Sequence, residues 1–288
     1  MDTTQMKAKE HFIEHGYYLE KSVFAEDDAL DVARWLRSQN QETLAKSQSD
    51  QEPGVRLAVL QNVHKIDTPI KTIATDKRML SLAGDLLGSD VYIWSSKINM
   101  KAAWCGTAEY FHQDFTYWKG RGYQRDQMMA CMVFLDPHRF ENAALHVLEG
   151  SHKLGPIEHD HFINVNGLSK FMIPPAKMTE LSKTCPLKVI EANPGDVLYF
   201  HAGLIHGSSH NISGNPRMIL LSQLNSFDNK PTEVGANARK FNLERCLFEL
   251  ENAKAKYEFF KAKYQTQIDS LDPTFNSPIP DEEREKLP

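Results

Sequence analysis

The sequence lacks an excess of basic residues and a long apolar run, and each absence excludes a class of protein. Its 33 Lys and Arg residues stand against 38 Asp and Glu, for a net charge of −5. No positive field is therefore available to hold a nucleic-acid backbone or an anionic membrane. No stretch approaches the ~18 apolar residues that span a bilayer, and the first residues are polar rather than a signal peptide. We expect a cytoplasmic protein with no nucleic-acid or membrane partner.

Cysteine is also scarce. The 4 cysteines stand singly, without a Cys-x-x-Cys pair, which excludes a disulfide framework and a zinc–thiolate site. The composition that remains is ordinary: 41% of the 288 residues are hydrophobic and 25% are charged. A chain of this kind buries a sizeable core, and we expect a single domain over residues 1–288.

The pattern of apolar residues and turn signals divides the chain into three parts. Residues 1–90 show mostly helical periodicity, and the predicted helices cover 6–14, 25–48 and 75–87. Residues 91–226 contain short strand-like runs separated by proline and glycine turns, which predicts a mainly β fold with flanking helices, either a sandwich or a jelly roll. The runs are 90–94, 128–135, 144–148, 187–191, 196–200 and 218–224.

A third part, residues 240–271, carries apolar or small residues at steps of three or four and predicts a C-terminal helix. Two interpretations of its apolar stripe are open. The stripe packs on the sheet of its own chain, or it forms a homodimer contact through Leu247, Leu250, Tyr257 and Tyr264.

The residues with the clearest chemistry are His112, Asp114 and His206. Side chains alternate along an extended segment, so His112 and Asp114 face the same side. A second histidine from a distant strand would complete a site of two histidines and one carboxylate, the arrangement that non-haem Fe(II) oxygenases use. Arg217 follows His206 after a turn, and its planar fork suits a carboxylate.

The order of five motifs resembles the phytanoyl-CoA dioxygenase family of Fe(II)- and 2-oxoglutarate-dependent oxygenases. The resemblance spans about residues 10–226, and around residues 93–118 it is most similar to ectoine hydroxylases. The motifs are His112-x-Asp114, Gly150-Ser151-His152-Lys153, Pro194-Gly195-Asp196, Phe200-His201 with Ile205-His206-Gly207-Ser208, and Asn211-x-Ser213-x-x-x-Arg217.

This resemblance implies a double-stranded β-helix, a cupin-like jelly roll, that binds Fe(II), 2-oxoglutarate and O2. It implies that His112, Asp114 and His206 hold the metal, and that Arg217 binds the distal carboxylate of 2-oxoglutarate. The further residues that it implies at the site are Ser208 or Ser213 as hydroxyl support, Trp118 lining the pocket, and Lys97 or Lys101 touching co-substrate or substrate.

The chain departs from the family pattern at two positions. The family commonly has a glycine followed by proline or cysteine where this chain has Ala143-Ala144, and a proline where it has Glu149. We expect these changes to reshape a loop near the mouth of the site. Asp114 is retained, whereas related halogenases replace this carboxylate by a small residue. Halogenation is therefore disfavoured.

The expected substrate is a small carboxylated molecule, amino-acid-like or a specialised metabolite, because the chain resembles ectoine hydroxylases and because Lys97, Lys101 and Arg121 are candidate contacts for an anion. The aromatic residues around the metal motif equally allow an apolar or cationic body. The expected reaction is oxidation of an unactivated C–H bond by hydroxylation, desaturation or cyclisation. Alternatives are a substrate tethered to CoA or a carrier protein, a jelly-roll sensor without turnover, and a cupin-like enzyme that does not use 2-oxoglutarate.

Overall fold

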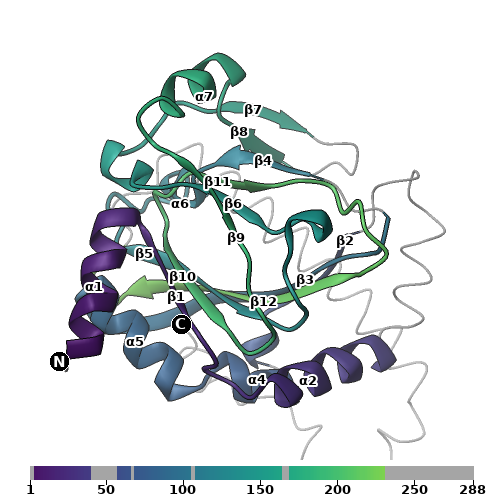
Figure 1. The fold of residues 1–288 in the computed structure, drawn as a ribbon. Helices are drawn as coiled ribbons and strands as arrows, with labels where there is room; N and C mark the ends of the chain where they lie inside the picture. The colour runs from purple at the N-terminus through teal and green to yellow at the C-terminus, as the bar shows by residue number, and fades with distance from the viewer. Residues whose placement is uncertain (1–2, 40–56, 66–67, 105–107, 164–168, 231–288) are drawn as a thin grey trace, which may run out of the picture. The chain divides into compact units, whose positions relative to one another are not determined.

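The structure is a computed structural model that describes residues 3–39, 57–65, 68–104, 108–163 and 169–230. Within these residues the protein is built from two antiparallel sheets, with helices on one side (Figure 1). No helix among them is long and apolar enough to cross a bilayer. The predicted helix over 240–271, with its proposed dimer contact, lies outside the described residues, so the single domain over 1–288 stays a prediction.

The larger sheet has six strands and the smaller has four. In spatial order the larger sheet contains β1 (Tyr17–Glu20), β10 (Val197–His201), β5 (Met128–Phe134), β12 (Arg217–Ser226), β3 (Val91–Lys101) and β2 (Leu57–Gln61). The smaller contains β4 (Glu109–His112), β11 (His206–Ser208), β6 (Leu145–Leu148) and β9 (Leu187–Ile190). A separate hairpin pairs β7 (Asp160–Ile163) with β8 (Ser169–Met172).

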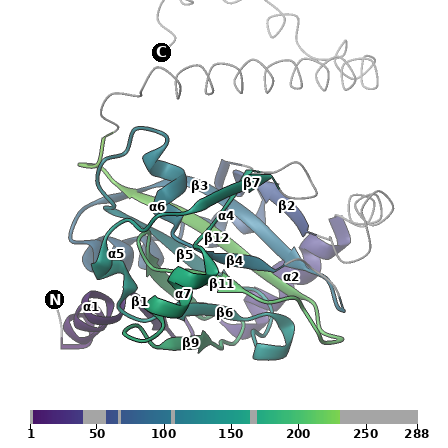
Figure 2. The ribbon, with the colours of Figure 1, turned by 90° about the horizontal axis from the view of Figure 1, so that it is seen from above.

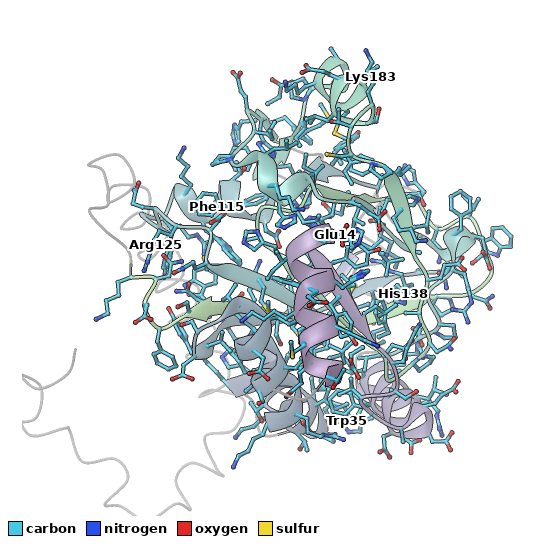
Figure 3. The ribbon with its side chains drawn as sticks, turned by 60° about the vertical axis from the view of Figure 1, so that its left-hand side comes forward. Glu14, Trp35, Phe115, Arg125, His138 and Lys183 are labelled. Carbon is cyan, nitrogen blue, oxygen red and sulfur yellow. The ribbon has the colours of Figure 1, made fainter. Side chains whose placement is uncertain are left out.

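Helices cover the outer face of the six-stranded sheet, and Figures 1 and 2 show them along that side. They are α1 (Thr3–His15), α2 (Glu26–Gln39), α4 (Pro69–Ala74) and α5 (Lys77–Leu87). Their apolar faces form one buried cluster with the sheet, and Figure 3 shows Trp35 of α2, which packs on this cluster. The short helices α6 (Asp114–Lys119) and α7 (Pro175–Leu181) lie elsewhere, α7 beyond the smaller sheet with the β7–β8 hairpin. Single 3-10 turns are η1 (Val63–Lys65), η2 (Phe140–Asn142) and η3 (Ser151–Leu154).

Along the central strands, successive side chains point to opposite faces of the sheet, and this alternation decides which of them face the space between the two sheets. On β12, Met218 and Leu220 join the cluster under the helices, whereas Ile219 and Leu221 join the cluster between the sheets. Because strand side chains alternate with period two, Arg217 faces inward with Ile219. Ile98 of β3 packs under the helices, so the inward positions of that strand are Lys97, Asn99 and Lys101. The interior therefore contains a polar strip on two paired strands.

The predicted mainly β architecture with flanking helices is confirmed, and six of the strands fall close to the predicted runs. The prediction that residues 1–90 are mostly helical missed β1 and β2, which are edge strands of the larger sheet. Their short lengths, 4 and 5 residues, give too few periods to identify a strand from sequence. The predicted helix over 25–48 is present as α2 as far as the described residues extend.

Candidate functional site

Two histidines lie side by side on neighbouring strands of the smaller sheet. His112 of β4 and His206 of β11 are directly paired, with ring centroids 4.4 Å apart. Nδ1 of His112 donates to the carbonyl of Tyr110 (2.7 Å) and Nδ1 of His206 donates to that of Leu204 (3.0 Å). Since a carbonyl only accepts, the two Nε2 atoms carry the lone pairs. These bonds orient both rings as ligands.

Asp114 completes the set from the first residue of helix α6. Its Oδ1 lies 3.6 Å from Nε2 of His112 and 3.9 Å from Nε2 of His206, and the three ligand atoms lie within 4.8 Å of one another. The expectation that one extended segment carries both His112 and Asp114 was wrong in detail, because the strand ends at His112. Asp114 Oδ2 is buried and has no hydrogen-bond partner among the described residues, so it is free for a cation.

The protonation states suit a metal. Burial lowers the pKa of His206 to about 4, and the neighbouring His112 adds to this effect. Burial by itself raises the pKa of Asp114, but the bond to His112 and the charges of His206, His112 and Lys97 bring it to about 2. A neutral imidazole and an ionised carboxylate are the ligating forms. The donor set of two nitrogens and one oxygen, with an orphaned carboxylate oxygen, therefore fits Fe(II).

Gln113, between the two ligands, anchors this segment. Its side chain donates to the carbonyls of Gly155 (2.9 Å) and Gly203 (2.7 Å) and accepts from the backbone N–H of Ile157 (2.8 Å). Its own backbone N–H donates to Nε2 of His159 (3.0 Å). Neither residue was among the predicted site residues: the His159-x-His161 spacing favoured a solvated loop, and the place of Gln113 inside the His-x-Asp motif was its one available signal.

Arg217 and Lys101 form a buried cationic pair on adjacent strands. They are directly opposite on β12 and β3, with exposed fractions of 5% and 2%. Nζ of Lys101 donates to Oγ of Ser208 (2.8 Å) and to the carbonyl of Ser209 (2.7 Å). Arg217 donates through Nη1 to the carbonyl of Ala143, whereas its buried Nε has no partner among the described residues.

The electrostatics of this pair suit the binding of an anion. Burial, reinforced by the charge of Arg217, lowers the pKa of Lys101 to about 7, and burial lowers that of Arg217 to about 10. Neither cation forms an ion pair with a carboxylate among the described residues. Two buried cations without a counter-ion are costly, and a bound carboxylate would remove that cost. Ser208, one of the two serines predicted as hydroxyl support, lies beside Lys101.

The side chains of Ser213 and Trp118 stabilise a turn and an apolar cluster, respectively. The hydroxyl of Ser213 donates to Oδ1 of Asn211 (2.9 Å), inside the turn that precedes β12. Trp118 is 2% exposed and packs in an aromatic cluster that includes Phe115 and Tyr123. The hydroxyl of Ser213 thus stabilises the turn, and Trp118 forms part of the core beneath α6.

Lys97 and Arg121, the other basic candidates, differ in their surroundings. Burial lowers the pKa of Lys97, while the charges of Asp114 and Glu109 partly restore it. Among the described residues Lys97 has no hydrogen bond or ion pair of its own, so its ammonium is available within reach of the metal ligands. The guanidinium of Arg121 stacks over the Trp94 ring at 4.6 Å.

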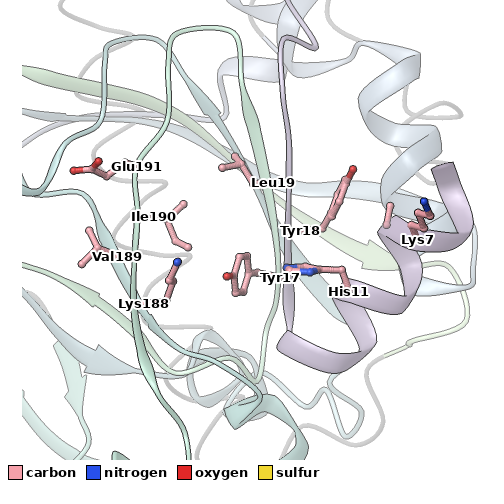
Figure 4. A pocket seen from close by; sticks show the side chains of 10 residues that line it. Lys7, His11, Tyr17, Tyr18, Leu19, Lys188, Val189, Ile190 and Glu191 are labelled. Atoms are coloured by element: carbon pink, nitrogen blue, oxygen red, sulfur yellow. The ribbon is translucent and has the colours of Figure 1, made fainter.

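A separate hollow of about 530 Å³ lies between α1, β1 and β9 (Figure 4). Its lining includes Lys7, His11, Tyr17 and Lys188, and it contains none of the residues that the sequence singled out. It sits at the free edges of the two sheets rather than between them. The chemistry therefore belongs to the inter-sheet site.

The family model described as "Phytanoyl-CoA dioxygenase (PhyH)" matches residues 12–219. Among curated proteins, the chain is 27% identical over 240 residues to the ectoine dioxygenase of Bordetella bronchiseptica, covering 78% of this chain and 77% of that one. It is 29% identical over 192 residues to the L-proline trans-4-hydroxylase of Streptomyces griseoviridis, covering 63% and 72%.

Solved structures share the fold. EctD from S. alaskensis in its apoform has a TM-score of 0.64 at 24% identity, with 82% of this chain and 81% of that chain covered. The carbocyclase SnoK from nogalamycin biosynthesis has a TM-score of 0.62 at 18% identity, with 83% and 90% covered. These likenesses confirm the predicted jelly roll.

Proposed function

Because the chain belongs to the phytanoyl-CoA dioxygenase family, we propose that this Fe(II)- and 2-oxoglutarate-dependent dioxygenase hydroxylates a C–H bond of a small carboxylated, amino-acid-like molecule. The observation that carries the proposal is the convergence of His112, Asp114 and His206 on one point. The curated relatives support the substrate class, since ectoine and L-proline, which their names contain, are small molecules with one carboxylate.

Three side chains would hold the iron. They are His112, His206 and Asp114, and Oδ2 of Asp114 has no hydrogen-bond partner among the described residues. When bound, iron and 2-oxoglutarate supply the oxidation of an unactivated C–H bond, coupled to the conversion of 2-oxoglutarate and O2 to succinate and CO2. The part of the protein is to orient the substrate carbon and to exclude water.

Arg217 and Lys101 would bind the distal carboxylate of 2-oxoglutarate. The unpartnered Nε of Arg217 and the ammonium of Lys101 offer donors from two adjacent strands, and Ser208, which contacts Lys101, adds a hydroxyl. A carboxylate that receives two charge-assisted bonds in a buried site is held strongly. Lys97 faces the same interior on β3 and would bind the carboxylate of the substrate.

The first experiment is anaerobic addition of Fe(II) and 2-oxoglutarate to metal-free protein. Chelation of the co-substrate by iron gives a weak visible charge-transfer band, which we expect in the wild type and not in His206→Ala. A folded protein that binds iron and shows no band would contradict the proposal and favour a metal-binding module without this co-substrate.

The second experiment tests the substrate class. Release of succinate is measured with small carboxylic acids and with their uncharged amides, and we expect the acids to stimulate release and the amides not. Lys97→Met should remove this difference, whereas Lys188→Met, at an exposed lysine of β9, should not. A CoA thioester in the same panel tests the tethered alternative, and a preference for it would overturn the proposed substrate class.

A further inference from the structure

An irregularity in the smaller sheet turns a carboxylate toward the site. In the pairing of β4 with β11, His206 lies opposite His112, whereas Ser208 lies opposite Glu109. Between these two pairs, the single residue Gly207 of β11 stands opposite two residues of β4, Tyr110 and Phe111, as in a β-bulge. Since paired residues face the same side, Glu109 shares the inner face with His112 although the two are three residues apart. Bulges are common beside active sites, where they re-aim a side chain.

Glu109 is bonded to Lys170 of β8. Nζ of Lys170 lies 2.9 Å from Oε1 and 2.8 Å from Oε2, and both side chains are partly buried, with 23% of Lys170 and 31% of Glu109 exposed. Burial acts to raise the pKa of Glu109, but Lys170, with His112 and Lys97, lowers it below its usual range. Glu109 is therefore an ionised carboxylate on the inner face, with a second cation, Lys97, within electrostatic reach.

The hairpin that carries Lys170 is held over the metal ligands by other contacts. The backbone N–H of Phe171 donates to the hydroxyl of Tyr117 (3.2 Å), and the Tyr117 ring lies edge-on to His112 at 5.7 Å. The backbone N–H of Ile173 donates to the carbonyl of Phe111 (2.8 Å). The attachment of β8 to β4 is therefore provided without Glu109. The ion pair between Glu109 and Lys170 is therefore not needed to join these strands.

We propose that Glu109 is a specificity-determining residue that binds the cationic nitrogen of the substrate, and that the ammonium of Lys170 occupies its carboxylate until the substrate enters. The cationic nitrogen of the substrate would replace the ammonium of Lys170, so Glu109 has a cationic partner both before and after the substrate binds. With Lys97 on the opposite sheet, the site would bind a molecule that carries a carboxylate and a protonated nitrogen. This inference rests on the proposed function, because it names the second recognition group of the same site.

The test measures anaerobic binding of matched probes to the complex with Fe(II) and 2-oxoglutarate. Each pair is an L-amino acid and a desamino partner of matched shape that lacks the protonated nitrogen, such as L-proline with its carbocyclic analogue cyclopentanecarboxylate and L-leucine with 4-methylpentanoate. We expect the wild type to bind an amino acid more tightly than its partner, and Glu109→Gln to reduce that preference at least about tenfold. Lys170→Gln removes the internal competitor, so it should bind the amino acid at least as tightly as the wild type.

The charge-reversed double variant, Glu109→Lys with Lys170→Glu, separates recognition from a structural link. It restores an ion pair between β4 and β8, but we expect it to lose the preference for amino acids. Recovery of the wild-type preference in this variant, or equal weakening by Lys170→Gln and Glu109→Gln, would overturn the inference. So would a wild type that binds no amino acid of the panel more tightly than its desamino partner.

The charge-transfer band shows whether a negative result contradicts the proposed function or only the role of Glu109. If the band is absent from the wild type, the proposed function fails. If the band forms in the wild type and in Glu109→Gln but the amino-acid preference is missing or unchanged, only the role of Glu109 fails. Thermal denaturation of each variant shows whether it is folded.

Discussion

The two sheets contribute opposite kinds of side chain to the space between them. The smaller sheet and the segment after it supply the metal ligands His112, His206 and Asp114 and the carboxylate of Glu109. The larger sheet supplies cations, Lys97, Lys101 and Arg217, from two adjacent strands. One wall of the site is thus suited to a metal ion and the other to anions.

The two walls also differ in how they are supported. β12 and β3 have 10 and 11 residues, and the helices of the larger sheet pack on their outer face. β4 and β11 have only 4 and 3 residues, and backbone carbonyls and Gln113 orient their ligands. The buried cations without a counter-ion therefore lie on the two long strands, which the apolar helix layer stabilises. The short strands position only the metal ligands and Glu109.

Removal of a metal ligand should have the largest effect. Loss of groups that merely support a ligand costs about 10–100-fold in metal affinity or activity, so His206→Ala should lose at least about 100-fold in both. His146→Ala is the matched control, because His146 pairs with Gly207 and therefore faces away from the site. Iron content and succinate release are the measurements. If His206→Ala kept its iron and its turnover, the assignment of the metal ligands to the smaller sheet would be wrong.

Substitution on the opposite wall should affect the co-substrate and leave the metal in place. Arg217→Lys keeps a charge and loses the planar fork, so the Kd for 2-oxoglutarate should rise about 10–100-fold, or about 1.4–2.7 kcal/mol. Iron affinity should stay as in the wild type. Arg78→Lys, at an exposed arginine of α5, is the control. A Kd unchanged by Arg217→Lys would show that the co-substrate carboxylate binds elsewhere.

Lys101 should make co-substrate binding depend on pH. With a pKa of about 7, Lys101 loses its proton near neutrality, and the protonated form is the one that attracts an anion. Affinity for 2-oxoglutarate should therefore fall as the pH rises above about 7, by up to about tenfold per pH unit. Binding measured at several pH values in wild type and Lys101→Met tests this, since the variant should lack this component.

Stability of the protein without co-substrate should change in the opposite direction. In the unfolded chain Lys101 keeps its proton up to its ordinary pKa of 10.5. Between about 7 and 10.5 the unfolded state therefore binds more protons, so the contribution of Lys101 to the free energy of unfolding rises with pH. Denaturant unfolding of wild type and Lys101→Met across this range measures that contribution. A contribution that falls with pH would contradict the buried-cation assignment.

The sequence predicted the metal ligands and the cations of the site but not Glu109. Spacing and resemblance identified His112, Asp114, His206 and Arg217, and the structure brings the first three together. Glu109 was not predicted, because it faces inward only through a bulge in the pairing of β4 with β11. A bulge depends on how two strands pair, and the alternation of residues along one strand gives no information on that pairing.

Other misses have similar causes. Lys170 lies far along the chain from Glu109, so no local spacing connects them. The strand β1 is specified by pairing with β10 rather than by its own pattern. The helix that begins at Asp114 is only 6 residues long, and tertiary contacts outweigh propensity at that length. Long-range pairing thus decided the features that the sequence pattern missed.

The smallest predicted effect lies at the joint between the two walls. Ala143, which stands where the family commonly has glycine, has φ 72°, in the left-handed region, and its carbonyl accepts from Arg217. An L-residue pays roughly 1–2 kcal/mol there. Because glycine also loses more entropy on folding, Ala143→Gly should raise the free energy of unfolding by only about 0.5–1 kcal/mol.

Ala144→Gly is the matched control, because Ala144 is as fully buried as its neighbour Ala143 but is not among the residues with positive φ. It should lower the free energy of unfolding by about 0.5–1 kcal/mol. The Kd for 2-oxoglutarate should stay the same in Ala143→Gly, since the bond to Arg217 uses a backbone carbonyl. Equal destabilisation by both substitutions would mean that the methyl group of Ala143 contributes more by packing than its backbone loses by strain. The two walls would then be joined by side-chain packing at this position as well as by the bond to Arg217.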